Sequence, residues 1–263
     1  MEKEKLTVVK IGGNIVDDES ALSAFLASFA GLEGKKILVH GGGKVATRLA
    51  ERLGVEVKML HGRRITDQAM LEVVTMVYAG LSNKQVVAGL QAHGVSAIGL
   101  SGADGNAIRC IKRPVREIDY GFVGDIVADS VNTSLIGSLL ADGHAPVFSA
   151  ITHDGKGQLL NTNADTIASA LAVAMAAAYA VSLVYCFEKR GVLRDVDDEE
   201  SLIPEIRESD FERLTREGVV ADGMIPKLRN AFDAISAGVK DVYVGHAHEL
   251  NRLQQGQFGT RMV

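Results

Sequence analysis

The chain alternates short apolar runs with segments in which apolar residues recur at the spacing of a helix face. The apolar runs are rich in β-branched residues and predict strands, and the amphipathic segments predict helices. The predicted strands are Leu6–Ile11, Lys36–His40, Val95–Leu100, Ala145–Ser149, Gln158–Leu160, Val181–Cys186 and Asp241–Val244. The predicted helices are Ala21–Phe29, Val45–Leu53, Thr66–His93, Val131–Leu140, Ile167–Ala178, Asp210–Arg216 and Pro226–Ala237. Because helices separate most strands, we expect an α/β fold, a three-layer αβα sandwich around a mostly parallel sheet.

Local signals add detail in three places. Thr66 is expected to cap the longest helix, and Gly94 to follow its end. Ala107–Val127 alternates and holds turn residues, so it predicts a β-hairpin region. Ile167–Phe187 carries no charge and is long enough to span a bilayer. Its first half is rich in alanine and its second half is β-branched and aromatic, which favours a buried helix followed by a buried strand.

Composition and charge narrow the class of protein. The 263 residues are 47% apolar and 23% charged, enough for one large α/β domain or two lobes. No repeat and no low-complexity linker divides the chain, so two lobes sharing one sheet fit best. The formal net charge of −5 argues against a protein that neutralises nucleic-acid phosphates over a broad surface. It leaves room for a small anion in a local basic pocket.

The cysteines and the N-terminus indicate a location. Cys110 and Cys186 are isolated, so they form neither a zinc motif nor a disulfide framework. The first residues contain no apolar signal core. We therefore expect a cytoplasmic protein. The acidic run Asp195–Glu200 is expected to be a solvated loop rather than a metal site.

Two glycine-rich turns follow predicted strands, at Gly12-Gly13 and at Gly41-Gly42-Gly43. Glycine at the end of a parallel strand lets backbone N–H groups approach an anion closely, often beside a helix N-terminus. Neither turn has the spacing of a Walker A loop or of a dinucleotide fingerprint. Open parallel sheets bind ligands at the carboxyl edge of their strands, so the pair of turns predicts an anion site there.

Several polar residues stand where a structural role alone does not explain them. Lys10 ends an apolar strand, where it either reaches solvent at the sheet edge or meets a partner such as a phosphate. Asn161, Asn163 and Asp165 precede a buried helix, and capping accounts for one or two of them.

Cationic residues stand at two further positions. Lys227 follows the turn Asp222-Gly223 at a helix start, where a cation is disfavoured unless it has an anionic partner. The pair Arg63-Arg64 is either solvated or a fork for a carboxylate.

In this order and spacing, these motifs resemble the amino acid kinase family, and within it the acetylglutamate kinase branch. The motifs are KIGGN (10–14), VHGGGK (39–44), HGRRIT (61–66), GFVGDI (121–126), NTNADT (161–166) and DGMIPK (222–227). Aspartokinases, uridylate kinases and carbamate kinases share the lysine–glycine opening but not the set HGRRIT, GFVG and NTNADT. The resemblance implies transfer of a phosphoryl group from ATP to the side-chain carboxylate of N-acetyl-L-glutamate, in arginine biosynthesis.

This chemistry explains why no histidine or glutamate stands out as a general base. A glutamate side chain has a pKa of about 4.3, so the nucleophile is already an anion at neutral pH. The difficulty is to bring that anion to a triphosphate. Catalysis should therefore consist mostly of positioning and charge compensation.

The resemblance also implies roles for individual residues. Lys10 and Lys227 would flank the transferred phosphoryl group, and Asp165 would orient their ammonium groups. The implied acceptor-binding residues are Gly42, Gly43, Arg64, Asn161 and Asn163. The implied ATP-binding residues are Gly12, Gly13, Glu188, Gly191, Val192 and Leu193. Mg²⁺ is expected to arrive on the phosphates of ATP without a cage of protein ligands.

The expected organisation is a lobe of residues 1–178 that binds the acceptor and dimerises, and a lobe of residues 179–263 that binds ATP. Two departures from the family pattern qualify it. Glu188-Lys189-Arg190 stands where the family usually has Asp-Val-x before Gly-Val-Leu, which leaves the adenosine site open. The N-terminal extension of arginine-inhibited hexameric relatives is missing. We therefore expect a homodimer insensitive to arginine, paired through the Thr66–His93 helix.

Three alternatives stay open. A basic acyl pocket would suit N-succinyl-L-glutamate, and spare positive charge is offered by Arg109, Lys112, Arg113 and Arg116, unless these are plain surface residues. A relative acting on aspartate or carbamate shares the fold. A non-catalytic effector-binding module would be expected to lose Lys10, Lys227 or Asp165, all of which are kept.

Overall fold

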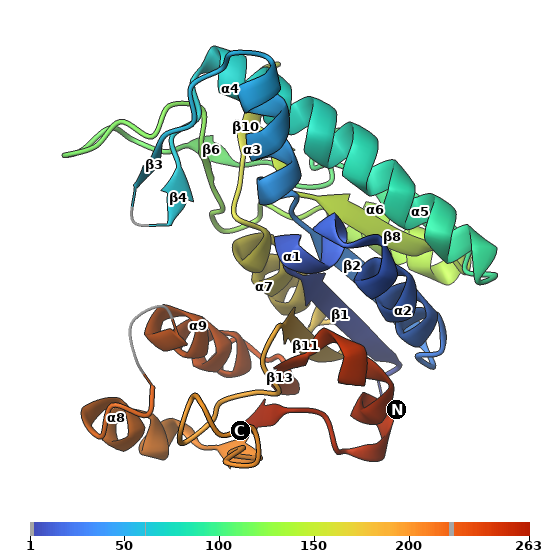
Figure 1. Ribbon diagram of the computed structural model, residues 1–263. Helices are drawn as coiled ribbons and strands as arrows, with labels where there is room; N and C mark the ends of the chain where they lie inside the picture. Colours follow the sequence, from blue (N-terminus) through green and yellow to red (C-terminus); the bar gives the residue numbers. More distant parts are fainter. Residues whose placement is uncertain (1–2, 61, 221–223) are drawn as a thin grey trace.

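A central β-sheet organises the fold, as the computed structural model shows (Figure 1). The structure describes residues 3–60, 62–220 and 224–263, so His61 and the turn Asp222-Gly223 of the motifs lie outside the described residues. Within these ranges eight strands form the sheet in the order β12-β14-β13-β11-β1-β2-β8-β5. Their bounds are β1 Lys5–Ile11, β2 Lys35–His40, β5 Ala97–Leu100, β8 Ala145–Ser149, β11 Ala180–Phe187, β12 Glu205–Ile206, β13 Asp241–His246 and β14 Thr260–Met262.

The sheet is mostly parallel, as predicted. The strands from β13 to β5 run in one direction, and β14 pairs antiparallel with β13 at one side. Three two-stranded ribbons lie outside it in the described residues. They are β3 Met59–Leu60 with β4 Arg63–Arg64, β6 Ile111–Lys112 with β7 Gly124–Asp125, and β9 Ile151–His153 with β10 Leu159–Asn161. The β6–β7 pair confirms the expected hairpin region.

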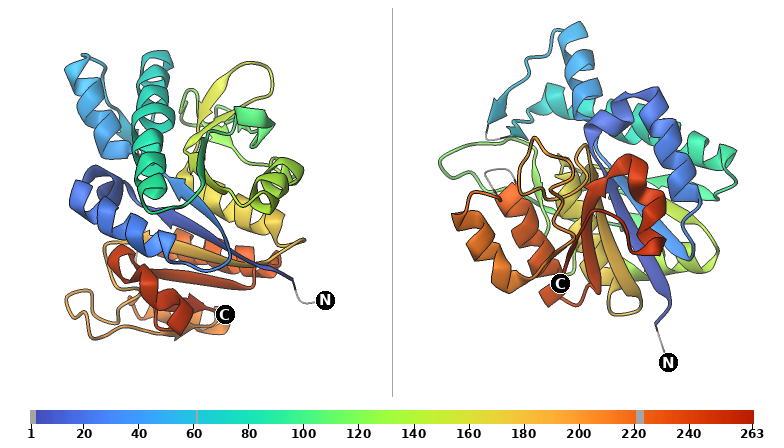
Figure 2. Two further views of the ribbon diagram at one scale, coloured as in Figure 1. Left: turned by 90° about the vertical axis from the view of Figure 1, so that its right-hand side faces the viewer. Right: turned by 60° about the horizontal axis from the view of Figure 1, so that its bottom comes forward.

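Helices cover both faces of the sheet (Figure 2). The α-helices are α1 Gly13–Asp17, α2 Glu19–Ala30, α3 Gly43–Arg52, α4 Gln68–Val74, α5 Asn83–Ala92, α6 Thr133–Ala141, α7 Ala164–Met175, α8 Glu208–Arg216 and α9 Met224–Ser236. Short helical segments of other types are η1 Thr75–Ser82, which is π-helical, and the 3₁₀ segments η2 Asp104–Asn106 and η3 Ala247–Gln255. The three-layer α/β architecture is therefore confirmed.

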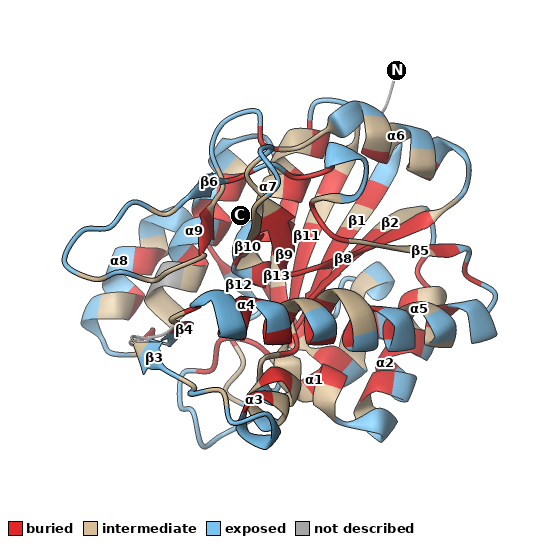
Figure 3. Cartoon of the chain, turned by 90° about the horizontal axis from the view of Figure 1, so that it is seen from above, coloured by how far each residue is buried: buried red, intermediate tan, exposed pale blue. Residues whose placement is uncertain are grey.

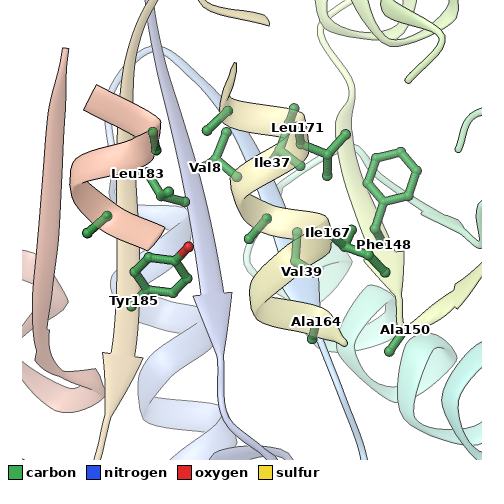
Figure 4. Close-up of a cluster of buried hydrophobic side chains, with 14 of the residues drawn as sticks. Val8, Ile37, Val39, Phe148, Ala150, Ala164, Ile167, Leu171, Leu183 and Tyr185 are labelled. Carbon is green, nitrogen blue, oxygen red and sulfur yellow. The ribbon is translucent and has the colours of Figure 1, made fainter. Parts of the chain in front are cut away.

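The alternation of side chains along the strands builds two cores. Val8 and Leu183 point to the face covered by α7, while Val9 and Val184 point to the face covered by α2. The strands are buried along most of their length (Figure 3). Figure 4 shows α7 laying Ile167 and other apolar side chains against the first of these faces. Burial on both faces explains the continuous apolar runs in the sequence.

The chain crosses the sheet at β1. From β1 it passes to β2 and then to the edge strand β5, and β8 is inserted between β2 and β5 before the chain continues on the other side of β1 as β11. In such sheets the connections leave on opposite faces at the switch point, which opens a crevice at the carboxyl ends of the strands. The division into lobes of 1–178 and 179–263 stays a prediction, with both parts contributing strands to this sheet.

The long helix begins one residue later than expected. Asp67, not Thr66, is its cap, because Asp67 Oδ1 accepts a hydrogen bond from the Met70 N–H at 2.8 Å. Thr66 is buried, and its backbone bonds the segment Tyr120–Phe122 instead. The helical run continues through α4, η1 and α5. The prediction of a Thr66 cap is wrong because a tertiary contact holds Thr66.

The uncharged stretch from Ile167 to Phe187 contains the end of α7 and all of β11, as predicted. Among the described residues, no helix has the length and apolar character needed to cross a membrane. Cys110 and Cys186 are both buried and free. Asp195–Glu200 is an exposed loop, as expected.

Several short elements carry no recognisable sequence signal. These are α1, β3, β4, β9, β12, β14, η2 and η3. Two- or three-residue strands are shorter than the window that periodicity needs, so only pairing partners reveal them.

Core packing under the sheet gives a test of stability. Leu171 of α7 is fully buried against the sheet, whereas Leu53 is 56% exposed. We expect Leu171→Ala to lower the free energy of unfolding by about 2–5 kcal/mol, because it removes buried methyl groups and leaves a cavity. Leu53→Ala should change it by less than about 0.5 kcal/mol. Urea denaturation of both variants measures the difference, and equal effects would contradict the assigned core.

Candidate active site

A cleft of about 690 Å³ opens at the carboxyl edge of the sheet. The strands end there together, since Ile11 is in register with His40 and Cys186, and His40 with Ser149. Both glycine turns reach this edge. Of the predicted site residues, the cleft is lined by Lys10, Gly13, Gly42, Gly43, Arg64, Asn161, Asn163 and Asp165.

The two glycine turns pack against each other. A Cβ atom added at Gly13 would lie 3.6 Å from Gly43 N. At Gly42 a Cβ atom would lie 2.9 Å from Tyr78 Cδ1, so a side chain there has no room. Gly42 is also the N-cap of α3, whose first backbone N–H groups have no partner within the helix. This arrangement presents free donors to an anion in the cleft.

Lys10 and Asp165 form an ion pair inside the cleft, with Lys10 Nζ 2.7 Å from Asp165 Oδ1. Lys10 stands at the end of β1, and its side chain is 11% exposed. Asp165 lies in the first turn of α7, where the helix dipole favours a carboxylate. The burial of a charged lysine at the end of an apolar strand is thus explained by a specific partner.

Lys227 approaches the same place from α9, which packs beside α7 and against β13. Its Nζ lies 4.0 Å from the centroid of the Phe187 ring, and Lys10 Nζ lies 5.2 Å from that centroid. The two ammonium groups therefore share one aromatic ring, although Lys227 comes from α9. Burial lowers the pKa of Lys227, the charge of Asp165 raises it, and the charge of Lys10 lowers it. Two cations and one carboxylate thus form a cluster.

Arg64 lines the cleft and is held in place by hydrogen bonds. It is buried, and its Nη2 donates to Gly43 O at 3.0 Å and to Thr47 Oγ1 at 2.8 Å. Its neighbour Arg63 is exposed and also lines the cleft. The interpretation of the pair as solvated therefore fits Arg63 but not Arg64. The role of Arg64 as a fork for a carboxylate stays a prediction.

The three polar residues before α7 have three different partners. Asn161 Nδ2 donates to Thr66 Oγ1 at 3.0 Å. Asn163 caps α7, with its Oδ1 accepting from the N–H groups of Asp165 and Thr166. Asp165 pairs with Lys10. Capping thus explains one residue of the three, and all three line the cleft.

The basic residues of the hairpin region are dispersed. Arg113 lines the cleft and pairs with Asp125, its Nε 3.0 Å from Oδ1. Arg116 lines a neighbouring hollow of about 580 Å³ together with Arg63 and Arg113. Lys112 lines neither the cleft nor this hollow, and its Nζ lies 4.5 Å from the Phe122 ring centroid. Arg109 lines neither.

The residues predicted to bind ATP lie mostly outside the cleft lining. Gly12 packs toward Cys186 O, and Glu188 follows the end of β11. Gly191, Val192 and Leu193 form a tightly packed turn, because a Cβ atom at Gly191 would lie 2.6 Å from Thr260 Oγ1. Val192 and Leu193 are buried. Their part in nucleotide binding stays a prediction.

No role was predicted from the sequence for two cationic residues that line the cleft. Lys44 and Arg48 of α3 line it beside Thr47. Their spacing of i and i+4 places them on one helix face, directly after the glycine turn. That spacing is the sequence feature from which both residues could have been predicted to line the cleft.

The comparisons with known proteins agree with this geometry. The model of the amino acid kinase family matches residues 5–246. The chain is 57% identical over 249 residues to the acetylglutamate kinase of Phocaeicola vulgatus, covering 95% of this chain and 96% of that one. It is 54% identical to the acetylglutamate kinase of Parabacteroides distasonis, covering 98% and 99%. The N-acetylglutamate synthase structure from Neisseria gonorrhoeae shares the fold, with a TM-score of 0.82 at 22% identity, over 100% of this chain and 60% of that one. The chain therefore belongs to the amino acid kinase family.

Proposed function

We propose that this chain transfers the γ-phosphoryl group of ATP to the side-chain carboxylate of N-acetyl-L-glutamate, forming N-acetyl-L-glutamyl 5-phosphate in arginine biosynthesis. The observation that carries the proposal is the cluster of Lys10, Asp165 and Lys227 beside two glycine turns. The acetylglutamate kinases that share more than half of its residues support the choice of acceptor.

The cluster suits phosphoryl transfer between two anions. The attacking carboxylate is ionised at neutral pH and needs no base, so the barrier comes from bringing negative charges together. Lys10 and Lys227 reach one aromatic ring from different elements and can compensate the charge of the moving group. Asp165 offsets the repulsion between the two ammonium groups while the phosphoryl group is absent.

Acceptor and nucleotide approach from different sides. Arg64 is oriented by Gly43 O and Thr47 to clamp the α-carboxylate of the acceptor, and Asn161 bonds the amide-bearing end. Backbone N–H groups of Gly13, Gly42 and Gly43 bind phosphoryl oxygens. ATP extends from there over the residues after β11, from Glu188 to Leu193.

Mg²⁺ fits this site as an ion bound to the phosphates of the nucleotide. In the described parts of the chain, no group of three or more acidic, histidine or cysteine side chains could hold a metal ion. Phosphate oxygens and water would therefore supply most ligands, with Asp165 the carboxylate beside them. When bound, the ion neutralises charge on the phosphates.

The assembly proposed is a cytoplasmic homodimer. Met76 and Leu81 of η1 are 51% and 50% exposed, on the helical run expected to pair two copies. Exposed apolar side chains of this size suit a partner surface. The free, buried cysteines suit a reducing compartment.

A longer, acidic acyl group is the second candidate. The cleft continues toward Arg63 and Arg113, which also line the hollow beside Arg116. The carboxylate of N-succinyl-L-glutamate would find Arg63 and Arg116 there, although Glu117 and the Arg113–Asp125 pair also line the hollow.

Removing either lysine tests the catalytic cluster. We expect Lys10→Ala and Lys227→Ala to lower kcat by about 100- to 1000-fold with little change in KM for the acceptor, because the lost charge acts on the transition state. A coupled ADP-release assay measures this. Lys58→Ala, at an exposed ion pair, is the control and should turn over normally. Near-normal turnover in both cluster variants would refute the assignment.

The acceptor preference is tested with purified protein. We expect kcat/KM for N-acetyl-L-glutamate to exceed that for N-succinyl-L-glutamate, and both to fall in Arg64→Lys, which cannot form the same fork. A preference for the succinyl compound that disappears in Arg63→Ala or Arg116→Ala would establish the second candidate instead.

The oligomeric state is tested by light scattering. The unaltered chain should be a dimer, and Met76→Glu with Leu81→Glu should give monomers, since charges in an apolar interface are costly. Leu53→Glu, equally exposed on α3's end, should leave the dimer intact. A hexamer would contradict the dimer, and a dimer that persists in the double variant would contradict pairing through η1.

A further inference from the structure

A buried histidine stands directly behind the second glycine turn. His40 is the last residue of β2, has no exposed surface and precedes Gly41. It does not line the cleft. Nothing in the proposed transfer uses this ring.

The hydrogen bonds of His40 fix a single form of the ring. Nδ1 lies 2.7 Å from Gly41 O, and a carbonyl oxygen can only accept, so Nδ1 carries the proton. Nε2 lies 3.1 Å from Asn83 Nδ2, which can only donate, so Nε2 accepts. Burial lowers the pKa of His40 to about 4, so the ring stays neutral.

The orientation of the Asn83 amide is determined independently. Asn83 Nδ2 also donates to Val147 O at 3.0 Å, and Asn83 Oδ1 accepts from Lys84 Nζ at 3.1 Å. A flipped amide would place two acceptors together at Val147 and two donors together at Lys84. The network therefore imposes the Nδ1-protonated tautomer on His40.

The π-helical segment η1 brings this support to the turn. Its Tyr78 and Ser82 pack under Gly42, where an added Cβ would lie 2.9 Å from Tyr78 Cδ1 and 3.2 Å from Ser82 Oγ. Asn83 follows Ser82 at the start of α5. The π-helical segment thus places Tyr78 and Ser82 against Gly42, and the residue after it, Asn83, against the His40 ring. Such segments are frequent at functional sites.

We infer that His40 is a positioning residue, which holds the Gly41 carbonyl through Nδ1–H and so aims the N–H groups of Gly42 and Gly43 at the transferred phosphoryl group. This inference rests on the proposed function. A donor misplaced by about 1 Å can cost on the order of 100-fold in rate. Loss of the Nδ1 bond should therefore act on kcat more than on KM.

Two matched substitutions separate the nitrogen atoms. His40→Asn places an amide nitrogen near Nδ1 and keeps a donor for Gly41 O, while His40→Gln places its amide near Nε2 and keeps a partner for Asn83. Each variant loses one hydrogen bond, so their thermal unfolding midpoints should fall alike. We expect His40→Asn to keep kcat within about 3-fold, and His40→Gln to lose about 10- to 100-fold, with KM values nearly unchanged.

The control is His93→Asn, at an exposed position after α5, which should change nothing. Equal losses of kcat in His40→Asn and His40→Gln, or a loss that follows the unfolding midpoint, would overturn the inference. So would normal kcat in His40→Gln.

A spectroscopic readout needs no turnover. Long-range ¹H–¹⁵N NMR of histidine-labelled protein should show one neutral ring with protonated Nδ1, absent in His40→Asn. A His40 ring that is protonated at Nε2, or charged at neutral pH, would overturn the inference. A chain that is folded and shows this signal but does not phosphorylate N-acetyl-L-glutamate would refute the proposed function while leaving the hydrogen bonding of His40 established.

Discussion

The ion pair between Lys10 and Asp165 is the contact on which the site depends. It joins the end of the central strand β1 to the first turn of α7, two elements far apart in the chain. A lysine at the end of an apolar strand is costly without a partner, and Lys227 adds a second cation nearby. One carboxylate, favoured by the dipole of α7, makes this concentration of positive charge tolerable in the absence of a phosphate.

The path of the chain explains why these residues meet. Strands β2 and β8 lie on one side of β1, and β11 and β13 lie on the other, all ending at one edge. Residues that follow strand ends therefore converge whatever their distance in sequence, which brings Gly13 and Gly43 to one cleft. Asp165 joins them because α7 begins at the same edge. The same rule places Phe187, at the end of β11, next to both lysines. The topology of the sheet thus decides which residues meet at the cleft, and side-chain pairing decides how they are oriented.

The sequence predicted the sheet well because its strands are buried on both faces and read as uninterrupted apolar runs. Lys10, Asp165 and the glycine turns could be identified from the sequence for the same reason, because they interrupt this clear apolar pattern. The cap of the long helix was misjudged because the pairing of Thr66 with the segment around Phe122 is tertiary. Short ribbons, the π-helical segment and the network of His40 depend on partners distant in sequence, and no local pattern encodes them.

The continuous sheet also limits how the cleft can move. β1 pairs with β11 along its whole length, so the two sides of the cleft share an unbroken ladder of backbone hydrogen bonds. A door-like swing about a flexible hinge would have to break that ladder. Substrate entry and product release are instead expected to proceed by slight changes of sheet twist. These changes move the carboxyl ends of the strands together or apart while the strands stay hydrogen-bonded.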